Sequence, residues 1–215
     1  TQSIESEKTK NPDSGVLFDY YLFNENIVVS PGENTKKRQT LGARIDKKFT
    51  RFSIEAEGAY QTGKYYSDNI EAYLLSLNLV FPIGFIRFTK SISFSQEYIS
   101  GDKYHLGGSD GVLSGFAKPF GAGHKFHGYY DNPLHKKFAN NSHAGLNEWI
   151  IKTKHEIFPD LNIVVKYHSF KDAIDVNTYG QELDFVLSKK LPLGCLLYTS
   201  PSPRDRTRSR MASSA

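Results

Sequence analysis

Hydrophobic and polar residues alternate along most of the chain. The clearest case is residues 51–62, where Phe52, Ile54, Ala56, Gly58 and Tyr60 fall on one face and polar residues fall mainly on the other. This period of two is typical of a β-strand with one apolar and one polar face. The same alternation, or a less regular β-rich pattern, predicts eight strands: 16–24, 40–49, 51–62, 71–81, 85–98, 145–157, 161–170 and 179–189.

The predicted strands are long, and the connections between them alternate in length. Ordinary strands have about five or six residues, whereas tilted strands that cross a bilayer have about 9 to 11. The short connections are 49–51, 82–84, 158–160 and 191–194, and the long ones are 25–38, 63–69, 99–144 and 171–178. In an up-and-down antiparallel sheet this places all the long connections on one side, as in outer-membrane barrels.

We therefore predict an all-β fold, an antiparallel up-and-down transmembrane β-barrel of which the chain supplies about eight strands. A bilayer offers backbone amides no water, so a spanning sheet must close. Its apolar faces would contact lipid and its polar faces would line the pore, with these candidate pore-lining residues: Arg44, Asp46, Glu55, Glu57, Arg87, Glu97, Lys152, Lys166, Glu182 and Asp184. The alternative is a soluble β-sandwich or barrel that binds or cleaves carbohydrate, with its apolar faces turned inward.

Composition excludes several other classes of protein. Only 39% of the 215 residues are hydrophobic, and no apolar stretch approaches the roughly 18 residues that a spanning helix needs, so a helical membrane bundle is excluded. Aromatic residues make up 13% of the chain, which argues against intrinsic disorder. A single cysteine argues against a disulfide scaffold and a cysteine-ligated metal domain.

The last 21 residues, 195–215, differ abruptly from the rest. They contain both sulfur residues, Cys195 and Met211, and are rich in Ser, Pro and Arg. They resemble a translated sequencing adapter, so we expect a non-native, disordered tail and a partial barrel over residues 1–194. The tail holds four of the 27 basic residues and one of the 23 acidic ones, which leaves the rest with a net charge of +1. We therefore expect no nucleic-acid partner.

Several motifs occur in a consistent order along the chain. They are TLGARIDKKFTRFSIEAEGAYQTGK at 40–64, YISGD at 98–102, FGAGHKFHGYYD at 120–131, AGLNEW at 144–149 and YGQELDF at 179–185. Together they resemble the alginate-export family of Gram-negative outer-membrane β-barrels. The resemblance covers about residues 13–194, but the terminal aromatic strand read by the membrane-insertion machinery is missing.

The resemblance implies a build similar to an 18-stranded pore, with this chain as its later half, in the outer membrane of a Gram-negative bacterium. It also implies passage of an anionic polysaccharide such as alginate through a lumen lined with Arg and Lys. Acidic residues match the candidate pore cations in this chain, so neither sign is in excess. We therefore expect a porin-like channel for a polysaccharide or another polar solute, which needs no cofactor.

The connection 99–144 is unusual because it has 46 residues and contains five of the seven histidines. A structureless loop of this length is uncommon unless it is functional. One hypothesis is that it folds over or into the barrel as a constriction, which would bring four lysines near the solute path: Lys118, Lys125, Lys136 and Lys137. The other is an extracellular cap packed by its own aromatic residues.

Neither the histidines nor the paired carboxylates of the chain predict a reactive centre. A metal site needs three or four converging ligands, and histidines scattered through a glycine-rich loop do not predict one. Glu55 with Glu57, and Glu182 with Asp184, have a spacing that also occurs in retaining glycosidases. In a polar lumen such carboxylate pairs are usually solvated side chains of the pore lining without a catalytic role. We therefore expect no metal, no catalytic residue and no enzyme activity.

Overall fold

The computed structural model describes residues 2–11, 16–30, 34–103, 111–117, 127–128, 144–174 and 178–189. Within these ranges the chain is all-β. The strands are β1 (Gln2–Asn11), β2 (Val16–Ser30), β3 (Asn34–Lys48), β4 (Ser53–Tyr65), β5 (Asp68–Pro82), β6 (Thr89–Ile99), β7 (Val112–Leu113), β8 (Leu146–Phe158), β9 (Leu161–Lys171) and β10 (Thr178–Lys189).

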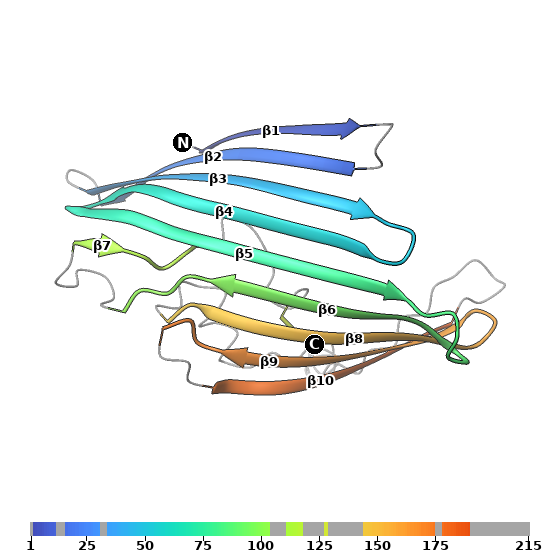
Figure 1. Ribbon diagram of the computed structural model, residues 1–215. Coiled ribbons are helices and arrows are strands. Elements are labelled where there is room, and N and C mark those ends of the chain that lie inside the picture. Colours follow the sequence, from blue (N-terminus) through green and yellow to red (C-terminus); the bar gives the residue numbers. More distant parts are fainter. Residues whose placement is uncertain are drawn as a thin grey trace, which may run out of the picture.

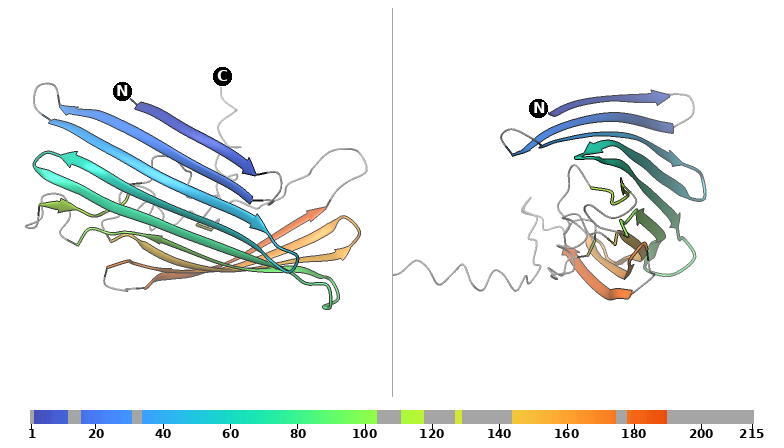
Figure 2. Two further views of the ribbon diagram at one scale, coloured as in Figure 1. Left: turned by 45° about the horizontal axis from the view of Figure 1, so that its top comes forward. Right: turned by 90° about the vertical axis from the view of Figure 1, so that its left-hand side faces the viewer.

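Nine of these strands form one large antiparallel sheet in which each strand pairs with the next along the chain. The order is β1-β2-β3-β4-β5-β6-β8-β9-β10, and the two-residue β7 pairs in parallel with β5 (Figure 1). In the described part of the chain, β1 and β10 form the two edges of the sheet, which is open. Figure 2 shows that the sheet curves, so that it has a convex and a concave face. The predicted all-β, up-and-down antiparallel architecture is confirmed.

The eight predicted strands are confirmed as β2 to β6 and β8 to β10, but the sequence did not predict β1. This strand contains only one apolar residue, Ile4, so it shows no alternation. It is held instead by antiparallel pairing with β2 along its full length. Backbone pairing of this kind does not depend on side-chain polarity, so the hydrophobic pattern could not predict this strand.

Two of the predicted long connections are wrong. The segment 25–38 is mostly strand, because β2 continues to Ser30 and β3 begins at Asn34. The segment 63–69 is also mostly strand, because β4 ends at Tyr65 and β5 begins at Asp68. Polarity does not alternate along these segments, because Ile27, Val28 and Val29 are apolar in succession and residues 34–38 are all polar, so the period of two cannot mark them.

The predicted start of the strand at residue 85 is wrong as well. β6 begins at Thr89, and the preceding Phe88 has a φ of 68°, which an extended strand does not allow. Arg87 therefore lies in the β5–β6 connection, where its guanidinium carbon is 4.7 Å from the centroid of the Phe88 ring. Its predicted place on the polar face of a strand is wrong.

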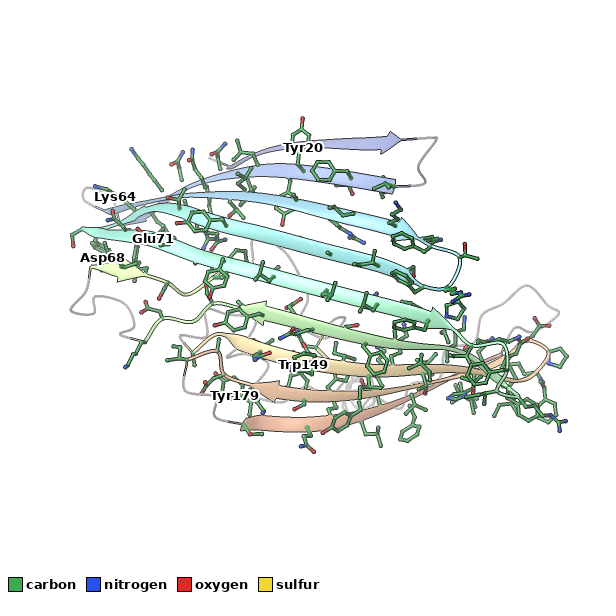
Figure 3. The ribbon with its side chains drawn as sticks, in the orientation of Figure 1. Tyr20, Lys64, Asp68, Glu71, Trp149 and Tyr179 are labelled. Atoms are coloured by element: carbon green, nitrogen blue, oxygen red, sulfur yellow. The ribbon has the colours of Figure 1, made fainter. Side chains whose placement is uncertain are left out.

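The convex face of the sheet is apolar and exposed. On β5 the side chains of Tyr73, Leu75 and Leu77 point to this face and alternate with more buried neighbours. Figure 3 views the convex face and labels Tyr20 of β2 and Trp149 of β8 on it. Exposed large hydrophobic residues on this face come from β2 to β6 and from β8 to β10: Phe18, Tyr20, Leu41, Ile45, Tyr60, Tyr73, Leu75, Leu77, Phe94, Trp149, Ile151, Tyr167, Leu183, Phe185 and Leu187.

The concave face carries the apolar core, to which the β6–β8 connection contributes. Phe116 packs there with six buried residues of the sheet: Ala59, Ala72, Leu74, Ile99, Leu146 and Phe170. The Phe116 amide donates to the Ser100 carbonyl at 3.0 Å. The described residues of the connection, 111–117 and 127–128, thus lie against the concave face, as the end-on view in Figure 2 shows. The predicted constriction lysines, Lys118, Lys125, Lys136 and Lys137, and the tail 195–215 lie outside the described residues.

Gly42 on β3 gives a first testable prediction. The Tyr21 ring occupies the space that a Cβ at Gly42 would fill, and its hydroxyl donates to Glu57 Oε1 at 2.7 Å. Gly42→Ala is expected to displace the ring, break this hydrogen bond and lower the free energy of unfolding by about 1–2 kcal/mol. Urea unfolding followed by fluorescence of the single tryptophan, Trp149, measures it.

Gly58→Ala on β4 is the matched control. A Cβ at Gly58 would meet only Leu75 Cδ2, at an ordinary contact distance of 3.7 Å. It should therefore change the unfolding midpoint much less than Gly42→Ala. Equal effects of the two substitutions would show that the packing of Tyr21 over Gly42 does not stabilise the sheet.

Candidate functional site

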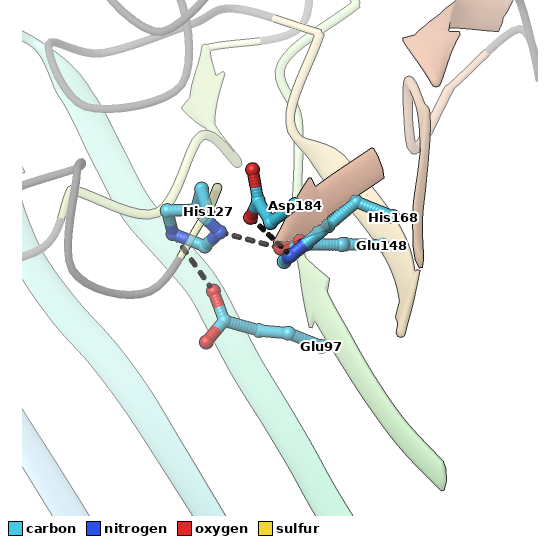
Figure 4. Close-up of polar contacts among 5 residues, drawn as sticks. All are labelled: Glu97, His127, Glu148, His168 and Asp184. Carbon is cyan, nitrogen blue, oxygen red and sulfur yellow. Dashed lines mark hydrogen bonds and ion pairs between the residues drawn. The ribbon is translucent and has the colours of Figure 1, made fainter. Parts of the chain in front are cut away.

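Buried polar side chains gather on the concave face where β6, β8, β9 and β10 lie side by side. Glu148 of β8 is 0% exposed and His168 of β9 is 1% exposed. His127, from the β6–β8 connection, and Asp184, from β10, are buried beside them. With Glu97 of β6 they form the group drawn in Figure 4, which we call the His–carboxylate cluster.

Glu148 is the centre of the His–carboxylate cluster. Its Oε2 is 2.5 Å from Nδ1 of His127, and its Oε1 is 2.6 Å from Nδ1 of His168. An ionised carboxylate can only accept hydrogen bonds, so both imidazoles donate to it through Nδ1. Each carboxylate oxygen thus has its own imidazole partner, which offsets the cost of removing the charge from water.

The second nitrogen of each imidazole also faces a carboxylate. Nε2 of His127 is 3.4 Å from Glu97 Oε1, and Nε2 of His168 is 3.3 Å from Asp184 Oδ2. Each histidine therefore lies between two acidic side chains that come from different strands. The cluster links β6, β8, β9 and β10 to one another and to the residue that the connection contributes (Figure 4).

Strand register explains why the acidic groups converge. Glu97 pairs directly with Glu148 across β6 and β8, and His168 pairs with Glu182 across β9 and β10. Like charges directly opposite each other destabilise a sheet unless a partner intervenes, and here His127 contacts both Glu97 and Glu148.

Gly128 allows the chain next to His127 to lie close to the concave face of the sheet. Its φ is 86°, a left-handed conformation that favours glycine. The Glu182 carboxylate occupies the space that a Cβ at this position would need. Any larger residue would strain the backbone and would require the Glu182 carboxylate to move, so the close docking of His127 is favoured by this glycine.

The structure places nine of the ten predicted pore-lining residues on the concave face. They are Arg44, Asp46, Glu55, Glu57, Glu97, Lys152, Lys166, Glu182 and Asp184, and Arg87 is the exception. The predicted carboxylate pairs are engaged by other side chains. Glu55 forms an ion pair with Arg44, and Glu57 accepts the Tyr21 hydroxyl. Lys152 and Lys166 pair directly across β8 and β9, with Asp184 next to Lys166 on β10.

The His–carboxylate cluster itself was not predicted. Alternation placed Glu97 and Asp184 on the polar face, but it carries no information on which strands are neighbours in register. His127 comes from a connection without periodicity, so no pattern linked it to Glu148. In the described part of the chain, no group of His, Cys, Asp and Glu side chains has an arrangement that holds a metal ion.

Gln61 of β4 forms a second set of contacts with the β6–β8 connection. Its side-chain amide donates to the Ala117 carbonyl at 2.7 Å and accepts from the Ala117 amide at 3.0 Å. Gln61→Leu is expected to remove both bonds and to increase amide hydrogen exchange in residues 111–117 by roughly thirtyfold, because the two bonds together contribute about 2 kcal/mol. Mass spectrometry of the exchanged protein measures this change.

Thr62→Val serves as the control for Gln61→Leu. Thr62 is exposed and faces the opposite side of the same strand. Exchange in residues 111–117 should stay at the wild-type rate in this variant. A Gln61→Leu protein that also exchanges at the wild-type rate would show that other contacts alone hold the segment.

No helix within the described residues is long and apolar enough to cross a membrane. Comparison of the sequence with protein-family models and with curated proteins found no match.

Proposed function

We propose that the chain is part of an outer-membrane β-barrel that forms a channel for a polysaccharide or another polar solute in a Gram-negative bacterium. The observation that carries the proposal is the convex face, which exposes large apolar side chains on every strand from β2 to β6 and from β8 to β10. Monomeric soluble proteins rarely expose an apolar patch of more than a few hundred Å². A lipid surface is the partner that such a face fits.

The apolar stretch has the length that a bilayer requires. On β5 the apolar residues that face the convex side run from Tyr73 to Phe81. The corresponding stretch runs from Phe52, which directly precedes β4, to Tyr60 on β4. At about 3.4 Å per residue each stretch is about 27 Å long, close to the roughly 25 Å apolar band of outer-membrane barrels. Both stretches have an aromatic residue at each end, as in the aromatic girdles of these proteins.

The concave face supports an aqueous path. It carries acidic and basic side chains, among them the partly exposed Arg44–Glu55 pair and the exposed Lys152. Charges of both signs fit a passive channel for a polar solute, and the resemblance to the alginate-export family favours a polysaccharide. The edges at β1 and β10 would pair with further strands of a closed barrel, because an open edge is not tolerated in lipid.

Cell fractionation tests the proposal. The protein, expressed from its complete gene in a Gram-negative host, is expected in the outer membrane, with a migration on gels that changes on heating. Purified protein is expected to give discrete conductance steps in planar bilayers. Recovery in the soluble periplasm, with no change on heating, would instead favour a soluble carbohydrate-binding or carbohydrate-cleaving β-protein.

A further inference from the structure

We infer that His127 sets the ionic selectivity of the proposed channel by covering an acidic patch on its wall. The acidic patch consists of Glu97, Glu148, Glu182 and Asp184. The inference rests on the proposed function, because ionic selectivity is a property of a conducting pore. It assigns a role to a buried histidine that the channel proposal leaves unused.

The register of the sheet concentrates the acidic patch in a small area. Glu97 and Glu148 are direct neighbours across β6 and β8, and Glu182 and Asp184 lie on the same face of β10. His168 lies between these two halves, since it contacts both Glu148 and Asp184. Four carboxylates thus face the concave side within one small region of the wall.

His127 and Gly128 cover this patch. Glu148 is 0% exposed, Asp184 is 7% exposed, and the side chain of Glu97 is 20% exposed with His127 in place. His127 contacts Glu148 and Glu97 directly, and Gly128 lies against the Glu182 carboxylate. Phe116, in the same connection, is buried in the core beside the patch. His127 and Gly128, which the strands do not supply, thus contribute to shielding these carboxylates from the solute path, together with His168 of β9.

When the acidic patch is covered, the exposed charges next to it on the concave face are positive. Lys152 is exposed on the concave face, and Lys166 pairs with it across β8 and β9. Fixed charges of one sign on a pore wall attract ions of the opposite sign. With His127 in place the lysines act on passing ions more strongly than the shielded carboxylates. Without it the carboxylates meet water and attract cations.

Reversal potentials in planar bilayers under a KCl gradient test this role of His127. His127→Ala is expected to raise the permeability ratio of K⁺ to Cl⁻ by roughly threefold, the order expected when carboxylates become exposed in a lumen screened over about 10 Å. Gly128→Ala keeps every charge but obstructs docking against Glu182, so it is expected to shift the ratio in the same direction. Adding Glu148→Gln to the His127→Ala variant should lower the permeability ratio part of the way back to the wild-type value.

His155→Ala is the control, because His155 lies on β8 and bonds to Thr89 and Thr153 away from the acidic patch. It should leave the ratio unchanged. Heat-modifiable migration shows which variants fold, and Gly128→Ala provides a second test if His127→Ala does not. A conducting wild type with an unchanged ratio in the folded variants overturns the role of His127 alone. A wild type that does not conduct overturns the proposed channel, and this role with it.

Discussion

Leu77→Arg is expected to prevent most of the protein from assembling in the outer membrane. Leu77 lies near the middle of the convex stretch between Tyr73 and Phe81 and is 38% exposed. An arginine at the middle of a lipid-facing barrel strand costs about 2–4 kcal/mol. The fraction of heat-modifiable protein in the outer-membrane pellet measures the loss.

Ser76→Arg is the matched control for Leu77→Arg. Ser76 is the neighbouring residue on β5 but faces the concave side, where its direct partners are Glu57 on β4 and Glu97 on β6. An arginine there meets two carboxylates in an aqueous lumen, so assembly should stay near the wild-type level.

The same pair of variants separates the membrane protein from a soluble one. In a soluble protein Leu77→Arg would replace an exposed apolar side chain with a charge, and surface changes of this kind usually alter stability by about 0.5 kcal/mol or less. Normal expression of a folded Leu77→Arg protein would therefore contradict the lipid-facing assignment of the convex face. A defect equal in both variants would point to a local effect on β5 instead.

The alternation of polarity predicted the faces of the strands well, because it reports directly which side chains avoid water. It placed Tyr60 and Leu183 on one face and Glu55 and Glu182 on the other, as the structure does. It failed where polarity does not alternate from residue to residue. The strand ends around Glu25 and Arg38, which form a buried ion pair, could not be separated from loop by polarity alone.

The His–carboxylate cluster required information that alternation does not contain. Glu97 and Glu148 belong to strands separated by the long connection 99–144, and their direct pairing depends on the register of β6 and β8. The alternating pattern determines which residues of a strand share a face. It does not determine which residue of the neighbouring strand lies opposite each of them, since a shift of the register by two residues keeps the same faces. His127 then enters from a connection whose path no periodicity describes.

Glu148→Leu is expected to give the largest loss of stability of any single change on the concave face considered above. The substitution removes the carboxylate that accepts from His127 and His168 and leaves two buried imidazoles without that partner. Breaking a buried, hydrogen-bonded charge pair by removing one member costs about 3–5 kcal/mol. Urea unfolding in detergent, followed by Trp149 fluorescence, should show the midpoint fall accordingly.

Glu55→Leu provides the comparison, because its partner Arg44 is on the same concave face but both side chains are partly exposed, at 37% and 42%. Ion pairs in contact with water contribute only about 0–1 kcal/mol. If Glu148→Leu were no more destabilising than Glu55→Leu, the cluster would not hold the sheet and the connection together. A large difference between them would mean that burial, rather than the mere presence of an ion pair, gives the cluster its strength. The docking of His127 would then be a stable feature of the wall, since its principal partner is the most buried carboxylate in that region.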